Sequence, residues 1–78
     1  MEEYILQELE MSLYRLADAQ YSALRSSSFD ELIVAYKYKV GTYIDLCIVL
    51  GFNYSHIVVT AGSVTLRADE AHSFDYLV

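Results

Sequence analysis

The stretch KVGTYIDLCIVLGF, residues 39–52, is the most apolar part of this 78-residue chain. A membrane-spanning helix needs roughly 20 mostly apolar residues. This run is too short for that, because it is interrupted by Lys39, Asp45, Gly51 and Asn53. We therefore predict that it lies in a core or at a protein interface and that the chain does not cross a membrane.

Apolar residues recur through this stretch at steps of four and three, the spacing of one side of an α-helix. Gly51 stands where a left-handed C-terminal cap is needed. We predict a helix over about residues 29–50, whose half from Tyr43 to Leu50 is apolar on nearly every side and must be covered on more than one side. The row comprises Phe29, Ile33, Tyr36, Val40, Tyr43, Cys47 and Leu50.

A strand over residues 42–50 is the alternative for the same stretch. Its threonine, tyrosine, isoleucine and valine residues favour β-structure. In that case Gly41 would end a shorter helix before it.

Residues 2–25 contain no glycine or proline, and their apolar positions again step by three and four. This pattern predicts a long amphipathic helix. The sequence SFDE, residues 28–31, has the spacing of a capping box. In this motif the side chains of Ser28 and Glu31 each accept a hydrogen bond from the other residue's backbone amide. The second helix is therefore expected to begin there, which makes the two helices an antiparallel hairpin.

Residues 55–68, SHIVVTAGSVTLRA, alternate as a β-hairpin does, with Gly62-Ser63 suited to a two-residue turn whose first residue has positive φ. The register pairs Val59 with Leu66, Ala61 with Val64, and Ile57 with Ala68, which makes one side of the hairpin wholly apolar. The tail, residues 73–78, either adds a third short strand or packs as an extended segment.

These elements give a single small α+β domain over residues 1–78, an antiparallel two-helix hairpin followed by a β-hairpin. We expect the second helix to be central, with the first helix on one side of it and the β-hairpin on the other.

Composition narrows the classes of function. Eleven acidic and five basic residues give a net charge of −6, so the chain repels a phosphate backbone and direct nucleic-acid binding is not expected. The single cysteine, Cys47, excludes an internal disulfide, and with no signal peptide at the N-terminus it fits a reducing cytoplasm. Eight tyrosines are a composition that suits protein interfaces.

Candidate catalytic and metal motifs are weak. DEAH, residues 69–72, resembles the acidic motif of a family of RNA helicases, but the chain has no glycine-rich phosphate loop with lysine. His56 and His72 with nearby acids lack the spacing of metal ligands, and Cys47 lies in the row expected to be buried. We expect no catalytic residue, no cofactor and no metal.

The expected function is therefore a non-enzymatic, acidic protein-binding module with a basic protein as partner. Small size and high acidity resemble the inhibitors that phages and mobile elements direct against nucleic-acid enzymes of the host, the anti-CRISPR and anti-restriction class, which would act in the host cytoplasm. Partner contacts are expected on the outer side of the first helix, at Glu3, Glu10, Asp18, Tyr14 and Tyr21.

A homodimer is also expected, because two helices and a short sheet leave apolar surface uncovered. Its two-fold axis is expected at the second helix or at an adjoining strand edge, with Gly41, Ile44 and Ile48 in the interface. The alternative function is a structural homo-oligomer without a separate ligand. A small metal-dependent or thiol enzyme is the least favoured of the three classes.

Overall fold

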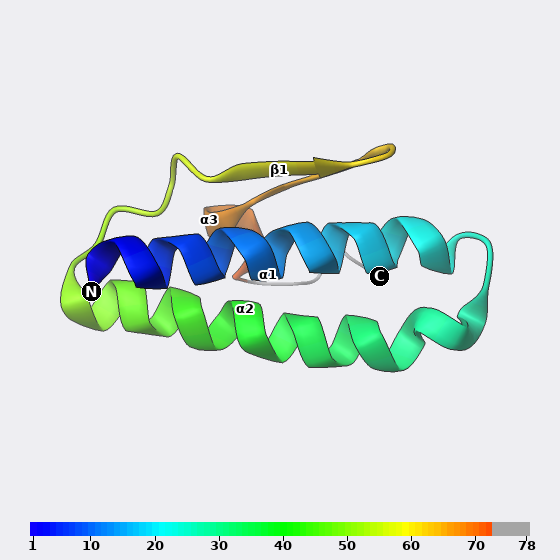
Figure 1. Cartoon of the computed structure of the whole chain (residues 1–78), viewed down its shortest axis with the longest axis horizontal. Coiled ribbons are helices and arrows are strands. Elements are labelled where there is room, and N and C mark those ends of the chain that lie inside the picture. The colour runs from blue at the N-terminus through cyan, green and yellow to red at the C-terminus, as the bar shows by residue number, and fades with distance from the viewer. Residues whose placement is uncertain (73–78) are drawn as a thin grey trace.

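The computed structural model of the chain describes residues 1–72. Two long helices, α1 (Glu2–Ala23) and α2 (Asp30–Leu50), form an antiparallel hairpin, and a 3-10 turn, η1 (Ser27–Phe29), joins them. The strands β1 (Val58–Ala61) and β2 (Val64–Arg67) follow, and a single helical turn, α3 (Ala68–Ala71), comes directly after β2. The predicted α+β order of a helical hairpin and then a β-hairpin is confirmed (Figure 1).

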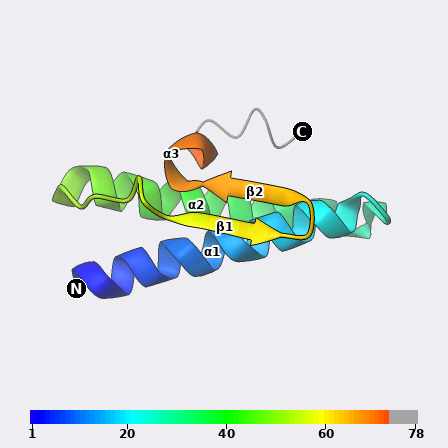
Figure 2. The same ribbon diagram turned by 90° about the horizontal axis from the view of Figure 1, so that it is seen from above.

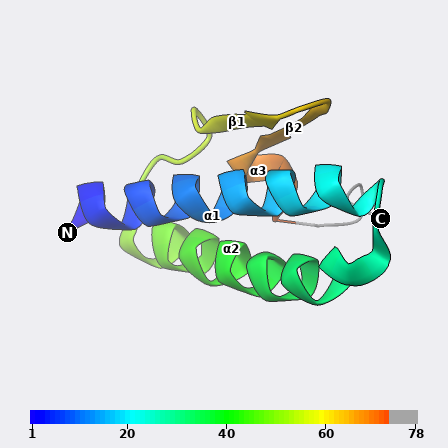
Figure 3. The same ribbon diagram turned by 45° about the vertical axis from the view of Figure 1, so that its right-hand side comes forward.

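The layer order differs from the expected one, because α1 is the central element. It packs against α2 on one side and against both strands on the other, as Figures 1 and 3 show. The prediction that α2 lies between α1 and the β-hairpin is therefore wrong. The buried positions of α1 explain the result, since they include Ile5, Ala17 and Ala19 beside the leucines and so form a side broad enough to meet two neighbours.

The core lies between these layers and continues under the hairpin. Leu9, Leu13 and Leu16 of α1 have no exposed surface. Burying such a side chain completely contributes about 1.5–3 kcal/mol each. The full set of buried apolar residues is Ile5, Leu9, Leu13, Leu16, Ala17, Ala19, Ile33, Val40, Ile44, Cys47, Ile57, Val59, Ala61, Leu66, Ala68 and Ala71.

The stretch 42–50 is helical throughout, so the strand alternative is wrong. The helix ends at Gly51, which adopts the left-handed conformation with φ of 75°, as predicted. Its amide donates to the Ile48 carbonyl, and the Phe52 amide reaches back to the Cys47 carbonyl at 2.8 Å. The packing of the inner side of α2 on α1 outweighs the β-propensity of the individual residues.

The start of α2 differs in detail from the prediction. The capping box of Ser28 and Glu31 does not form, because Phe29 takes the N-cap position and has no capping side-chain bond. One turn earlier, the Ser26 hydroxyl accepts a hydrogen bond from the Ser28 amide at 3.3 Å. The serine run therefore caps the 3-10 turn rather than the α-helix.

The β-hairpin has the predicted register. Val59 pairs with Leu66 and Ala61 with Val64, and the Ala68 amide donates to the Ile57 carbonyl at 3.2 Å. Ile57, Val59, Ala61 and Leu66 are buried, whereas Thr60 and Thr65 are exposed on the opposite side. Figure 2 shows the two strands running side by side, with α3 at the end of β2. The predicted third strand lies in residues 73–78, outside the described part of the chain.

The hairpin tip is fixed to α1 by one close approach. Gly62 has φ of 59°, which confirms the predicted positive value, and a Cβ added there would collide with the ring of Tyr21. The ring thus occupies the space that any side chain at position 62 would need. Glycine is required here both by its backbone conformation and by its contact.

We predict that Gly62→Ala destabilises the protein by about 2–3 kcal/mol, because the left-handed conformation costs an L-residue about 1–2 kcal/mol and the Tyr21 ring must also move. Gly51→Ala is the matched control, since its φ is also positive but no atom lies within 4 Å of the added Cβ. It should cost only about 1 kcal/mol. Urea unfolding measures both values.

In a Tyr21→Ala background, Gly62→Ala should lower the free energy of unfolding by only as much as Gly51→Ala does. If Gly62→Ala and Gly51→Ala lower the free energy of unfolding equally when Tyr21 is present, Tyr21 has no part in the need for glycine at position 62.

Candidate functional site

The outer side of α1 carries an acidic row. Glu3, Gln7, Glu10, Tyr14 and Asp18 step by three and four residues, so they lie along one side of the helix. All five are exposed. From Glu3 to Asp18 the row extends for about 22 Å at 1.5 Å per residue. We call these five residues the acidic row.

The carboxylates of the acidic row form no ion pair with any of the described residues. Within residues 1–72, Glu3, Glu10 and Asp18 make no side-chain hydrogen bond or ion pair. An ion pair does join Arg67 and Asp69 at 3.3 Å, in a different part of the surface. The three predicted partner-binding acids are thus brought together on one exposed side of α1, and none of them is ion-paired within residues 1–72, although Arg15 lies exposed three residues before Asp18.

The two tyrosines predicted at this surface have different environments. Tyr14 lies within the acidic row and is 52% exposed, so its ring is available to a partner. Tyr21 is only partly exposed, because it packs under Gly62. Its hydroxyl accepts a hydrogen bond from Arg25 at 3.2 Å, and the guanidinium lies 5.3 Å from the ring centroid. Tyr21 packs against the hairpin tip, so less of its ring than of Tyr14 is available to a partner.

A second surface lies on α2 and is apolar. Only four residues of α2 are buried, so its side away from α1 is open. Four large side chains there are more than half exposed: Val34, Tyr38, Ile48 and Val49, at 68%, 78%, 55% and 80%. We call these four residues the α2 apolar surface.

Of the residues expected at a dimer axis, Ile48 and Gly41 retain exposed surface but Ile44 does not. Ile44 belongs to the core of the single chain, because it lies on the side of α2 that faces α1. Its assignment to an interface is therefore wrong. A charged residue at position 44 would unfold the chain instead of separating two copies.

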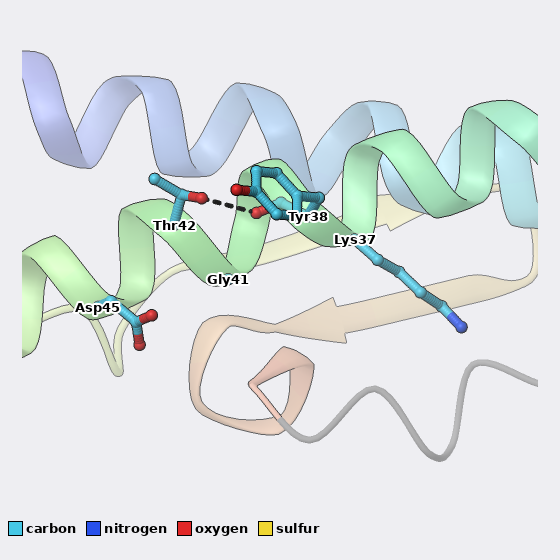
Figure 4. Close-up of a pocket in the computed structure, with 5 residues that line it drawn as sticks. All are labelled: Lys37, Tyr38, Gly41, Thr42 and Asp45. Atoms are coloured by element: carbon cyan, nitrogen blue, oxygen red, sulfur yellow. Dashed lines mark hydrogen bonds between the residues drawn. The ribbon is translucent and has the colours of Figure 1, made fainter.

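A shallow hollow of about 260 Å³ lies on α2 beside this surface. Lys37, Tyr38, Gly41, Thr42 and Asp45 line it. Figure 4 shows Lys37 and Asp45 extending from the same side of the helix, with Gly41 between them. The Thr42 hydroxyl donates to the Tyr38 carbonyl at 2.9 Å, so that this side chain is turned back onto its own helix.

The residues of the DEAH sequence are placed by a short helical turn. Asp69 accepts hydrogen bonds from the Glu70 amide at 3.0 Å and from Arg67 Nε at 3.3 Å. His56 and His72 are both exposed. In the described part of the chain, no three histidine, cysteine, aspartate or glutamate side chains are grouped so that they could hold a metal ion.

The thiol of Cys47 is fully buried in the core. Burial raises its pKa above the ordinary value of 9.0, and the carboxylate of Glu2 adds to the shift. Burial likewise raises the pKa of Tyr43, with smaller contributions from Glu8 and Tyr4. A protonated, inaccessible thiol is a poor nucleophile.

No protein-family model matches the sequence, and no curated protein or solved structure is significantly similar to it. Of the helices in residues 1–72, none is long and apolar enough to cross a membrane.

We predict that Cys47 reacts with iodoacetamide at pH 8 at least about 100-fold more slowly in the folded protein than in urea, because the thiol is buried and protonated. Mass spectrometry of timed samples measures the rate. Equal rates in the two conditions would contradict the burial of Cys47.

The same shift makes the stability depend on pH. A folded-state pKa above that of the unfolded chain gives stability that is fully present below pH 9.0 and is lost as the pH rises through the raised value. Between about pH 8 and about pH 10.5, the free energy of unfolding should therefore fall more steeply for the wild type than for Cys47→Ala. Tyr43 contributes equally to both proteins, so the difference reports Cys47.

Proposed function

We propose that the protein is a non-enzymatic protein-binding module and that the acidic row of α1 meets a basic surface of its partner. The observation that carries this proposal is the set of three exposed carboxylates on one side of α1, none of which has a partner within the described residues. Aligned charges of one sign steer a complementary protein and speed its association.

Tyr14 can contribute affinity to such a contact, which exposed charges alone do not. Exposed carboxylates on an interface rim act mainly on the rate of association and contribute little to affinity. A half-exposed tyrosine offers a large rigid surface with a polar tip, and tyrosine is enriched among residues that dominate binding energy. Tyr14 lies between Glu10 and Asp18, where a partner drawn to the carboxylates would cover it.

A partner that normally binds nucleic acid fits these properties, because its basic surface is built to meet phosphates. A row of carboxylates on a rigid helix would compete for that surface. The narrower proposal is therefore an inhibitor of the anti-CRISPR or anti-restriction class, and it rests on the charge and size of the chain.

We predict that the double substitution Glu3→Lys with Glu10→Lys slows association with the partner about tenfold or more and reduces the dependence of that rate on salt, because it reverses two of the three carboxylate charges. The measurement is capture from a lysate of the native host at low and high salt. Binding kinetics with the captured protein then separate the association rate from the dissociation rate.

The matched control is Asp30→Lys with Glu31→Lys, which makes the same change of net charge in the first turn of α2. It should retain binding. Equal losses for the two double variants would show that overall charge matters and that the acidic row does not, and unchanged binding in both would leave these carboxylates a role in solvation only.

A further inference from the structure

The charges and apolar residues around Gly41 are arranged symmetrically along α2. Lys37 precedes Gly41 by four residues and Asp45 follows it by four. Val34 and Ile48 lie seven residues before and after it. All five fall on one side of the helix, because steps of three, four and seven return to the same side. The pattern therefore reads the same in both directions, apart from the sign of the charge.

We propose that a second copy of this chain covers this side of α2, and that the two helices cross antiparallel on a two-fold axis at Gly41. The axis sets Lys37 of each copy opposite Asp45 of the other, and Val34 opposite Ile48. Every residue then meets a complementary one, as a two-fold interface requires. We choose a second copy as the partner because the residues before Gly41 are complementary to the residues after it.

The structure around Gly41 is suited to such a crossing. A glycine has no side chain, so two helix backbones can approach closely there. The hollow of about 260 Å³ beside it lies between Lys37 and Asp45. Tyr38, which is 78% exposed, projects three residues from the axis, where the two-fold places it beside Asp45 and the hollow of the second copy.

Within a single chain these groups are left unsatisfied. Lys37 and Asp45 make no side-chain hydrogen bond or ion pair within the described residues, and they stand about 12 Å apart along the helix axis. The apolar residues Val34 and Ile48 are exposed on the same side. Association would pair the charges and remove the apolar groups from water in one step.

This inference is independent of the proposed function. The acidic row lies on α1, and α2 carries every residue of the crossing. Dimerisation and partner binding can therefore succeed or fail separately, and each has its own variants.

Sedimentation velocity between about 1 and about 300 µM tests the proposal. A single helix crossing is a small interface, so we expect a monomer–dimer equilibrium with a Kd in the range of about 1–100 µM. Lys37→Asp or Asp45→Lys alone sets like charges opposite each other and should raise the Kd at least about tenfold. The double variant Lys37→Asp with Asp45→Lys restores opposite charges and should return the Kd to within about threefold of the wild type.

Two further variants separate this interface from a general effect of charge or folding. Lys39→Asp makes the same charge change on a different side of α2 and should leave the Kd unchanged. Gly41→Leu favours the helix but fills the point of closest approach, so it should give monomers with undiminished helical circular dichroism.

Three results would overturn the proposal. They are a wild type that is monomeric over the whole concentration range, a dimer that tolerates both single charge reversals, and a double variant that fails to recover while its circular dichroism is unchanged.

Discussion

The burial of α1 on two sides is the constraint on which the rest of the structure depends. Leu9, Leu13 and Leu16 are completely enclosed, because α2 covers one side of this helix and the β-hairpin covers another. In so small a chain each element has few neighbours, and the helix that gains two of them forms the core. The Tyr21 ring under Gly62 adds a fixed point at the hairpin tip, so the sheet is held against the same helix along its length.

The distribution of exposed side chains follows from that choice. With both other layers packed on α1, the side of it that reaches water includes the acidic row with Tyr14, and it also includes Arg15. Helix α2 contacts the core along one side only, which leaves large apolar side chains such as Val49 and Tyr38 in solvent. The two surfaces differ in chemistry, and they suit two different kinds of contact. We propose a basic protein, drawn by charge, for the first surface and a second copy of the chain for the other.

Cys47 and Asp69, which the sequence offers as candidate catalytic residues, both have structural roles. Cys47 fills the core between the helices, and burial keeps its thiol protonated. Asp69 accepts two hydrogen bonds at the start of α3, one from a backbone amide and one from Arg67. These local roles account for the two groups through packing and hydrogen bonding.

The sequence by itself determined the two long helices and the β-hairpin, although it left a strand open for residues 42–50 and did not predict α3. Apolar spacing of three and four, the glycine after residue 50 and the alternation around Gly62 are short-range signals, and the helices, the C-cap and the hairpin register follow from them. Only the tertiary structure decided which helix is central, because both helices carry an apolar side and the choice depends on how the layers share it. Because α1 is central, Ile44 lies in the core, Tyr21 packs under the hairpin, and the side of α2 away from α1 is exposed. The physical reason is that helical periodicity tells which residues share a side of an element, whereas burial of that side depends on the neighbour that packs against it.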